Sequence, residues 1–320
     1  MKQLTLIEET TDWKDPLGYL KNREEADKDS PIVVSYGGGK NSTAMLIAMV
    51  YKGIVPNLIL FADTGAELPE TYDWINKFSS WLVSNGFPAI TVVKKEQKEA
   101  RKERKSVLVK WKLSYKNLEW FYLELCLGML ANGHQYISYG NLYEKCVALK
   151  TLPSRTFNRG ECSMSWKVEP QERYTKNWYK GTAKIRKFIG YHAGEVFRLI
   201  NKSKNPFDDD TYRYEYPLID WGLHEHHCVA LISSIGLGIP PKSSCFFCPN
   251  RKRADVVSLK ESHPELYEAA CFLEENFIPR ENAFVGLGRR WRWSDIDTLT
   301  PLEQTITALR DEQRVCACLD

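Results

Sequence analysis

The chain has 320 residues, enough for one large or two modest domains with a buried core. Its formal net charge of +3 is too small to indicate a nucleic-acid partner by itself. No apolar run approaches the roughly eighteen residues of a membrane span, and the polar first residues do not resemble a signal peptide. We therefore expect no membrane association and a cytoplasmic location, where nine cysteines indicate metal, cluster or redox chemistry more than disulfides.

A run of glycines follows the first predicted strand, over residues 31–36, and precedes a helix predicted over 42–52. Glycine lets the backbone approach a ligand closely, and the free N–H groups of a first helical turn attract anions. We therefore expect a phosphate-binding loop, whose candidate residues are Ser35, Gly37, Gly38, Gly39, Lys40, Asn41 and Ser42. A glycine-rich turn that binds nothing is the alternative, because the spacing is neither GxxxxGKS/T nor GxGxxG.

Strand and helix patterns alternate through the first part of the chain. A second strand is predicted over 57–63, a helix over 69–85 and a third strand over 89–95. This alternation predicts an α/β fold, a Rossmann-like parallel sheet with helices on both faces. Such sheets bind ligands at the carboxyl ends of their strands.

Asp63, Thr64 and Gly65 end the second predicted strand. A carboxylate at the carboxyl end of a buried strand is placed to bind a ribose hydroxyl or a metal ion on a nucleotide. We therefore add these three residues to the candidate nucleotide site.

A strongly basic run occupies residues 94–116, and a helix is predicted directly after it, over 117–133. The run is either a solvated surface segment or a patch that receives a polyanion such as DNA or RNA. We treat about residues 94–135 as an insertion into the α/β domain. The chain then mixes short strands and helices, and it is predicted to be mostly helical over 255–313.

Cys245 and Cys248 have the CxxC spacing, by which two thiolates can bind one metal ion from a single turn. Three neighbouring histidines and the cysteine after them occupy either the first turns of a helix, which we favour, or a second metal site: His224, His226, His227 and Cys228. Cys316 and Cys318, close to the end of the chain, are either a redox tail or an incidental exposed pair.

Several of these segments together resemble a known superfamily. The glycine loop is similar to the SGGxDS pyrophosphate loop of the adenine-nucleotide α-hydrolases, which include the PP-loop ATP pyrophosphatases and the phosphoadenylyl-sulfate (PAPS) reductases. Gly37 and Asn41 stand where that pattern has Ser and Asp. The segment from Asp63 to Thr71 resembles the DTGxxxPET motif of the PAPS reductases.

Later segments match the same family in its order. Residues 162–170 resemble a CCxxRKxxP segment, with Ser163 in place of the second cysteine. Residues 190–198 resemble GxRxxES followed by arginine, with His192 in place of the first arginine; a histidine there is more often structural than catalytic. Residues 217–221 read PLIDW and precede the CxxC.

The resemblance implies a PP-loop nucleotide-binding domain over residues 1–220 and a helical, cysteine-bearing region over 221–320. It implies ATP (or PAPS) and Mg²⁺ as ligands, with four catalytic residues: Lys40, Asp63, Lys167 and Arg198. It also implies a 4Fe–4S cluster, with zinc as the alternative, on Cys162, Cys245, Cys248 and Cys271. Cys228 is an alternative fourth ligand, and a cluster with three cysteine ligands is a further alternative.

The function implied is that of an ATP pyrophosphatase and sulfurtransferase that adenylylates and thiolates a nucleic-acid acceptor, as in DNA phosphorothioation and related mobile-element proteins. A cysteine desulfurase or a thioredoxin-type protein would supply sulfur or electrons. One alternative is a PAPS or adenylyl-sulfate reductase that produces sulfite. Another is a DNA-associated, nucleotide-binding module with weak or no catalysis.

Overall fold

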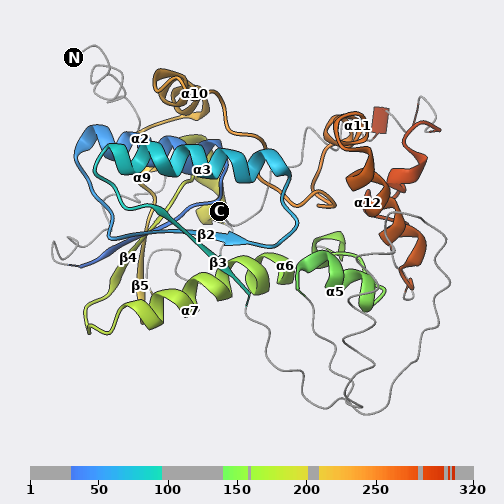
Figure 1. The fold of residues 1–320 in the computed structure, drawn as a ribbon, viewed down its shortest axis with the longest axis horizontal. Helices are drawn as coiled ribbons and strands as arrows, with labels where there is room; N and C mark the ends of the chain where they lie inside the picture. Colours follow the sequence, from blue (N-terminus) through green and yellow to red (C-terminus); the bar gives the residue numbers. More distant parts are fainter. Residues whose placement is uncertain are drawn as a thin grey trace.

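The computed structural model describes residues 30–95, 140–157, 160–200, 209–279 and 284–298, together with residues 302, 305 and 306. Within these ranges five parallel strands form one sheet in the order β3-β2-β1-β4-β5 (Figure 1). The strands are β1 (Ile32–Ser35), β2 (Leu58–Asp63), β3 (Ile90–Lys94), β4 (Ile185–Ile189) and β5 (Tyr212–Glu215). The predicted Rossmann-like α/β fold is confirmed, and the three predicted strands correspond to β1, β2 and β3.

Strands β1 and β2 are buried along their whole length because both faces of the sheet are covered. Every residue of β1 and β2 is buried, as expected for parallel strands between two layers of helices. Helices α2 (Lys40–Lys52), α3 (Pro69–Ser84) and α10 (Glu225–Ser234) lie on one face, and α7 (Glu169–Trp178) lies on the other (Figure 1). The short helix α9 (Pro217–Asp220) precedes α10, which packs on α2.

A second apolar core lies beside the carboxyl ends of β2 and β3 (Figure 1). Trp166, Phe247 and Trp293 are among its buried members. The elements around it are α5 (Leu142–Ala148), η1 (Ser154–Phe157), α6 (Glu161–Ser163), the π-helical turn η2 (Met164–Val168), α11 (Arg253–Ser262), α12 (Pro264–Asn276) and η4 (Trp293–Asp295). The helical C-terminal part thus shares this core with residues 142–168. The domain boundary after residue 220 stays a prediction.

Several features predicted from the sequence lie outside the described residues. These are the basic run from residue 96 onward, the helix predicted over 117–133 and the Cys316 and Cys318 pair. Lys94 and Lys95, at the start of the basic run, are described. No helix in the described ranges is long and apolar enough to span a membrane.

Glu274 is a carboxylate inside the second core, with only 1% of its surface exposed. Its Oε1 accepts a hydrogen bond from the Leu287 backbone N–H at 2.6 Å, and its Oε2 accepts one from the Ser294 N–H at 3.3 Å. Burial raises the pKa of Glu274 to about 7. The side chain therefore connects α12 to the 284–298 segment by hydrogen bonds. Because of its raised pKa, it gains or loses a proton near neutral pH.

This pKa predicts a pH-dependent stability. A carboxyl whose pKa is raised by folding stabilises the folded state at low pH, and this contribution is lost as the pH rises through the folded pKa. We expect the free energy of unfolding, measured with urea, to fall by roughly 1–3 kcal/mol between about pH 5 and about pH 8 because of this group. Glu274→Gln should remove most of that slope, whereas Glu275→Gln, at an exposed position on the same helix, should keep it. An unchanged slope in Glu274→Gln contradicts the prediction.

Candidate functional site

The glycine loop connects β1 to α2 at the carboxyl edge of the sheet. Gly38 has a φ of 76°, which favours glycine, and a Cβ there would lie 3.3 Å from Ser243 Oγ and 3.4 Å from the Phe61 ring. The Ser243 hydroxyl donates to the Gly37 carbonyl oxygen. Gly39 caps α2 without a side-chain hydrogen bond. The backbone N–H groups in the first turn of this 13-residue helix therefore face the loop without a capping side chain from Gly39. Such N–H groups are suited to bind an anion.

Two serines of the predicted loop stabilise it from within. Ser42 is fully buried; its hydroxyl accepts from the Gly37 N–H at 3.2 Å and donates to the Gly39 carbonyl at 3.3 Å. Ser35 is also buried, and its hydroxyl donates to Gln171 Oε1 on α7 at 2.8 Å. Both hydroxyls therefore hold the backbone in place, whereas the loop's glycines and Lys40 remain the groups suited to contact phosphate.

Gly190 is a part of this site that the sequence reasoning did not select. It directly follows β4, the neighbour of β1, and a Cβ there would lie 2.8 Å from both the backbone N and the Cα of Ser42. The strand end and the start of α2 are in contact without a side chain between them. The signal that could have found it was a glycine placed directly after an apolar strand at the ligand-binding edge.

Two carboxylates from distant segments contact the start of α2. The Lys40 ammonium pairs with Glu225 at 2.5 Å, and this hydrogen bond and charge lower the pKa of Glu225. The Asn41 amide donates to Glu195 Oε2 at 2.8 Å. Glu195 lies in η3 (Ala193–Glu195), beyond the end of β4, and Glu225 is the first residue of α10. Neither was predicted, because only the tertiary fold brings them to the loop.

Arg198, predicted as an anion contact, is held by protein groups. Arg198 lies on α8 (Phe197–Ile200). Its guanidinium donates to Glu195 Oε1 at 2.8 Å and lies 3.8 Å from the centroid of the Tyr191 ring. His192 caps η3 by accepting from the Gly194 N–H at 3.1 Å, and burial lowers its pKa. The structural role expected for His192 is thus confirmed, while Arg198 supports Glu195.

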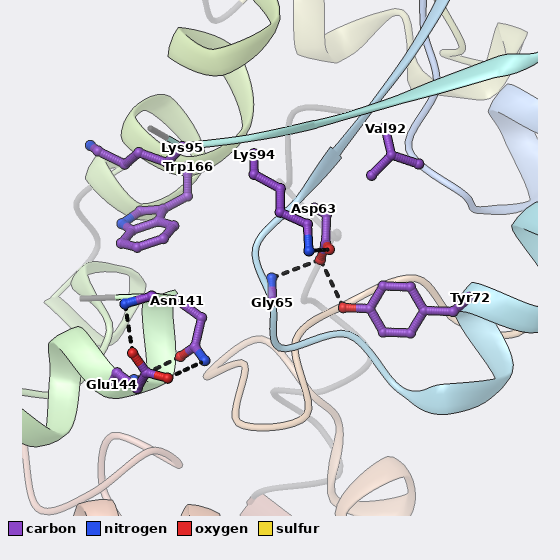
Figure 2. A pocket seen from close by; sticks show the side chains of 10 residues that line it. Asp63, Gly65, Tyr72, Val92, Lys94, Lys95, Asn141, Glu144 and Trp166 are labelled. Carbon is purple, nitrogen blue, oxygen red and sulfur yellow. Dashed lines mark hydrogen bonds and ion pairs between the residues drawn. The ribbon is translucent and has the colours of Figure 1, made fainter. Parts of the chain in front are cut away.

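Asp63 ends β2 next to the loop and is only 5% exposed. Its Oδ1 accepts from the Gly65 N–H and from the Tyr72 hydroxyl, each at 2.7 Å, and its Oδ2 lies 3.2 Å from Lys94 Nζ (Figure 2). Burial, followed by the hydrogen bond to Asp63, raises the pKa of Tyr72. The carboxylate is therefore fixed in orientation at the strand end, as a contact to a hydroxyl or a cation requires.

A cavity of about 540 Å³ opens around Asp63 at the ends of β2 and β3 (Figure 2). The residues that line it are Asp63, Gly65, Tyr72, Val92, Lys94, Lys95, Gly140, Asn141, Glu144 and Trp166. Lys95 Nζ lies 5.5 Å from the centroid of the Trp166 ring. Gly65 has a φ of 69°, and a Cβ there would lie 2.5 Å from Asn141 Cβ, so this wall requires glycine. Cations, an aromatic ring and a buried carboxylate thus surround one space.

Lys167 lies one residue beyond Trp166, but it is not among the described residues that line the cavity. Its ammonium lies 3.5 Å from Glu67 Oε1, and the Glu67 side chain is fully buried. Neither carboxylate oxygen of Glu67 has a hydrogen-bond partner among the described residues. Lys167 therefore compensates a buried carboxylate, a requirement that the sequence motif did not indicate.

The four cysteines predicted as cluster ligands do not form a metal centre in this structure. Among the described residues, no three or more histidine, cysteine, aspartate or glutamate side chains are arranged to hold a metal ion. None of these four residues, Cys162, Cys245, Cys248 and Cys271, forms a disulfide within the described part of the chain. The Cys245 thiol lies 3.2 Å from Thr64 Oγ1, and burial raises the pKa of Cys271 to about 11. Cys271 belongs to the second apolar core, and Cys162 and Cys245 pack against it.

The alternatives considered for metal binding are equally unsupported by the geometry. Cys228 is buried in the apolar core that α2, α3 and α10 form with the sheet, and burial raises its pKa to about 12. His224 caps α10, and its backbone N–H donates to His227 Nδ1 at 3.1 Å. The histidines therefore mark a helix start, as favoured from the sequence.

Comparisons with known proteins agree with the nucleotide-site features. Residues 31–119 match the family model of the phosphoadenosine phosphosulfate reductase domain. An uncharacterised protein of Methanocaldococcus jannaschii is 23% identical over 274 residues, which are 84% of this chain and 53% of that protein. The chain thus spans about half the length of that relative. The resemblance to the PAPS reductases, inferred from the loop and the Asp63 motif, is confirmed over residues 31–119.

A solved structure also aligns with most of the chain. It is the U34-tRNA thiolase NcsA from Methanococcus maripaludis with its 4Fe–4S cluster. The alignment covers 85% of this chain and 80% of that one, with a TM-score of 0.42 and 13% sequence identity.

Proposed function

We propose that this chain is an ATP pyrophosphatase of the PAPS reductase-like class that activates a nucleic-acid acceptor with AMP for thiolation. The observation that carries the proposal is the position of an anion-binding helix start and a fixed carboxylate on neighbouring strands. The glycine loop follows β1, Asp63 ends β2, and β1 pairs with β2. A nucleotide that spans adjacent strand ends would place its phosphates at the loop and its ribose or its cation at Asp63.

The chemistry assigned to the site is a displacement at phosphorus followed by a displacement of AMP. An acceptor oxygen attacks the α-phosphorus of ATP, the bond to the bridging oxygen breaks, and pyrophosphate leaves with the electron pair. The first-turn N–H groups of α2 and the Lys40 ammonium stabilise the charge that develops on this leaving group. A hydrosulfide, released from the persulfide of a cysteine desulfurase by a thioredoxin-type thiol, then attacks the activated acceptor atom and displaces AMP.

Asp63 is the residue suited to a magnesium ion. Mg²⁺ bound with a nucleotide is commonly held by one or two carboxylates together with phosphate oxygens, and Asp63 offers a buried carboxylate with a fixed orientation. Such an ion would neutralise part of the phosphate charge. No step is assigned to an iron–sulfur cluster, because the predicted cysteines do not converge on a metal site.

A nucleic-acid acceptor is favoured by the wall of the cavity next to Asp63. Lys94 and Lys95 supply positive charge for a phosphodiester backbone. Proteins that bind nucleic acids use such cationic side chains to neutralise the phosphate charges of the backbone. Both lysines also begin the basic run for which a polyanion patch is one of the two interpretations.

The proposal is tested by the rate of pyrophosphate release from ATP, measured alone, with DNA and with RNA. We expect release only when nucleic acid is present. Lys40→Ala should lower this rate by about ten- to hundredfold, because the ammonium faces the leaving group. Lys77→Ala, at an exposed position of α3, should leave it unchanged.

Other outcomes of these assays contradict the proposal in different ways. Sulfite formed from PAPS with thioredoxin would identify the chain as a reductase. Tight nucleotide binding with no pyrophosphate release under any condition would identify a binding module.

A further inference from the structure

We propose that Glu195 is a positioning residue for the phosphate loop, which fixes the Asn41 amide and makes asparagine, not aspartate, the residue that functions at this position. This inference rests on the proposed function, because it concerns how the same loop receives a nucleotide. It explains the departure of Asn41 from the SGGxDS pattern by a contact that no local sequence motif contains.

The orientation of the Asn41 amide follows from its partner. A carboxylate only accepts hydrogen bonds, so the group that faces Glu195 Oε2 at 2.8 Å has to be the amide NH₂. The carbonyl oxygen of Asn41 therefore points away from Glu195. It accepts no hydrogen bond from the described residues. This oxygen is the group left to the nucleotide, as a neutral acceptor for a hydroxyl or a ligand for its cation.

Glu195 is itself held in place by two further hydrogen bonds. It is 8% exposed, its Oε1 accepts from Arg198 at 2.8 Å, and its Oε2 also accepts from the His192 backbone N–H at 3.2 Å. Arginine stays protonated at any physiological pH. Arg198 in turn lies against the Tyr191 ring, at 3.8 Å from its centroid. The order of contacts is thus Arg198 to Glu195 to Asn41, leading from β4's end to the first turn of α2.

An aspartate at position 41 would conflict with this arrangement. Its carboxylate would meet the Glu195 carboxylate at hydrogen-bond distance, with no donor between the two and with like charges repelling in a poorly solvated place. The conflict is removed if Glu195 becomes glutamine, because a glutamine amide donates to a carboxylate. The pair therefore predicts that Asn41→Asp is harmful alone and is rescued by Glu195→Gln.

The test is a double-mutant cycle on ATP affinity, measured by isothermal titration calorimetry with the full chain. We expect Asn41→Asp to weaken ATP binding by about tenfold or more and Glu195→Gln by less. The double variant should return to within about threefold of the wild type. Asn76→Asp, at an exposed position on α3, is the matched control and should bind as the wild type does. Thermal unfolding of each variant shows that it is folded.

Two results overturn the proposal and are distinguishable from each other. If the wild type binds ATP but the two effects add, or Asn41→Asp binds as well as the wild type, Glu195 does not position Asn41 and the proposed function survives. If the wild type binds no adenine nucleotide, the proposed function fails and the positioning role fails with it.

Discussion

Replacing Gly190 by alanine is expected to lower ATP affinity at least about tenfold and the free energy of unfolding by roughly 1–3 kcal/mol. The added Cβ would lie 2.8 Å from the backbone N and Cα of Ser42, and backbone cannot turn away as a flexible side chain can. The first turn of α2 would therefore have to move from the end of β4, and its N–H groups would leave the position in which they face a phosphate.

The effect of Gly190→Ala is measured by urea unfolding and by calorimetric titration with ATP. Gly160→Ala is the matched control, because a Cβ at Gly160 meets no atom within 4 Å and its φ of −80° suits alanine. If Gly190→Ala has wild-type stability and wild-type ATP affinity, the contact between the end of β4 and α2 does not determine the position of the phosphate loop.

The second large effect is expected for Asp63→Asn, which should lower the rate of pyrophosphate release about 100- to 1000-fold. The temperature of thermal unfolding should change little. The substitution keeps the shape of a buried side chain that has three polar partners, and it removes the charge that faces the ribose or the cation. Asp73→Asn, at an exposed position of α3, is the control.

The measurements on Asp63→Asn are the release rate and the temperature of thermal unfolding. A variant that unfolds before nucleotide can be added would leave the role of the charge undecided, so Tyr72→Phe is included as a milder change that removes one hydrogen bond to the carboxylate. An unchanged rate in a folded Asp63→Asn would exclude this carboxylate from the reaction.

The first three strands and the phosphate loop were predictable because their signals are local. A β-branched run, three glycines and a helix pattern are contiguous, and Asp63 directly ends the next strand. Such a layout fixes both the element types and the edge of the sheet at which the glycines meet the carboxylate. Thr64 and Gly65 follow by the same argument.

The partners of the loop were not predictable, because they come from segments far away in sequence. The pairing of β4 with β1 brings Gly190 and Glu195 to the start of α2, and the packing of α10 on α2 brings Glu225 there. Ser243 contacts the loop at Gly37. A motif shows that a residue is polar at a strand end, but it does not show which charge lies opposite. The contact between Asn41 and Glu195 therefore could not be inferred from the loop motif.

The same limit affected the basic residues and the cysteines. Arg198 and Lys167 lie beside buried carboxylates of the protein, Glu195 and Glu67, and their predicted contacts with anions of the substrate stay predictions. Cysteine is at once a metal ligand and a small apolar residue, and the spacing of Cys245 and Cys248 does not distinguish these uses. Cys245 packs against the second core, and its role as a cluster ligand stays a prediction.

The most direct test of the account is to identify the bond of ATP that is cleaved. ATP labelled on its α-phosphate is mixed with the full chain and nucleic acid, quenched after a single turnover, and separated into its products. We predict labelled AMP, free or attached to the acceptor, together with an equal amount of pyrophosphate. Labelled ADP with inorganic phosphate, or unchanged ATP under every condition, would contradict the assignment of the loop to pyrophosphate.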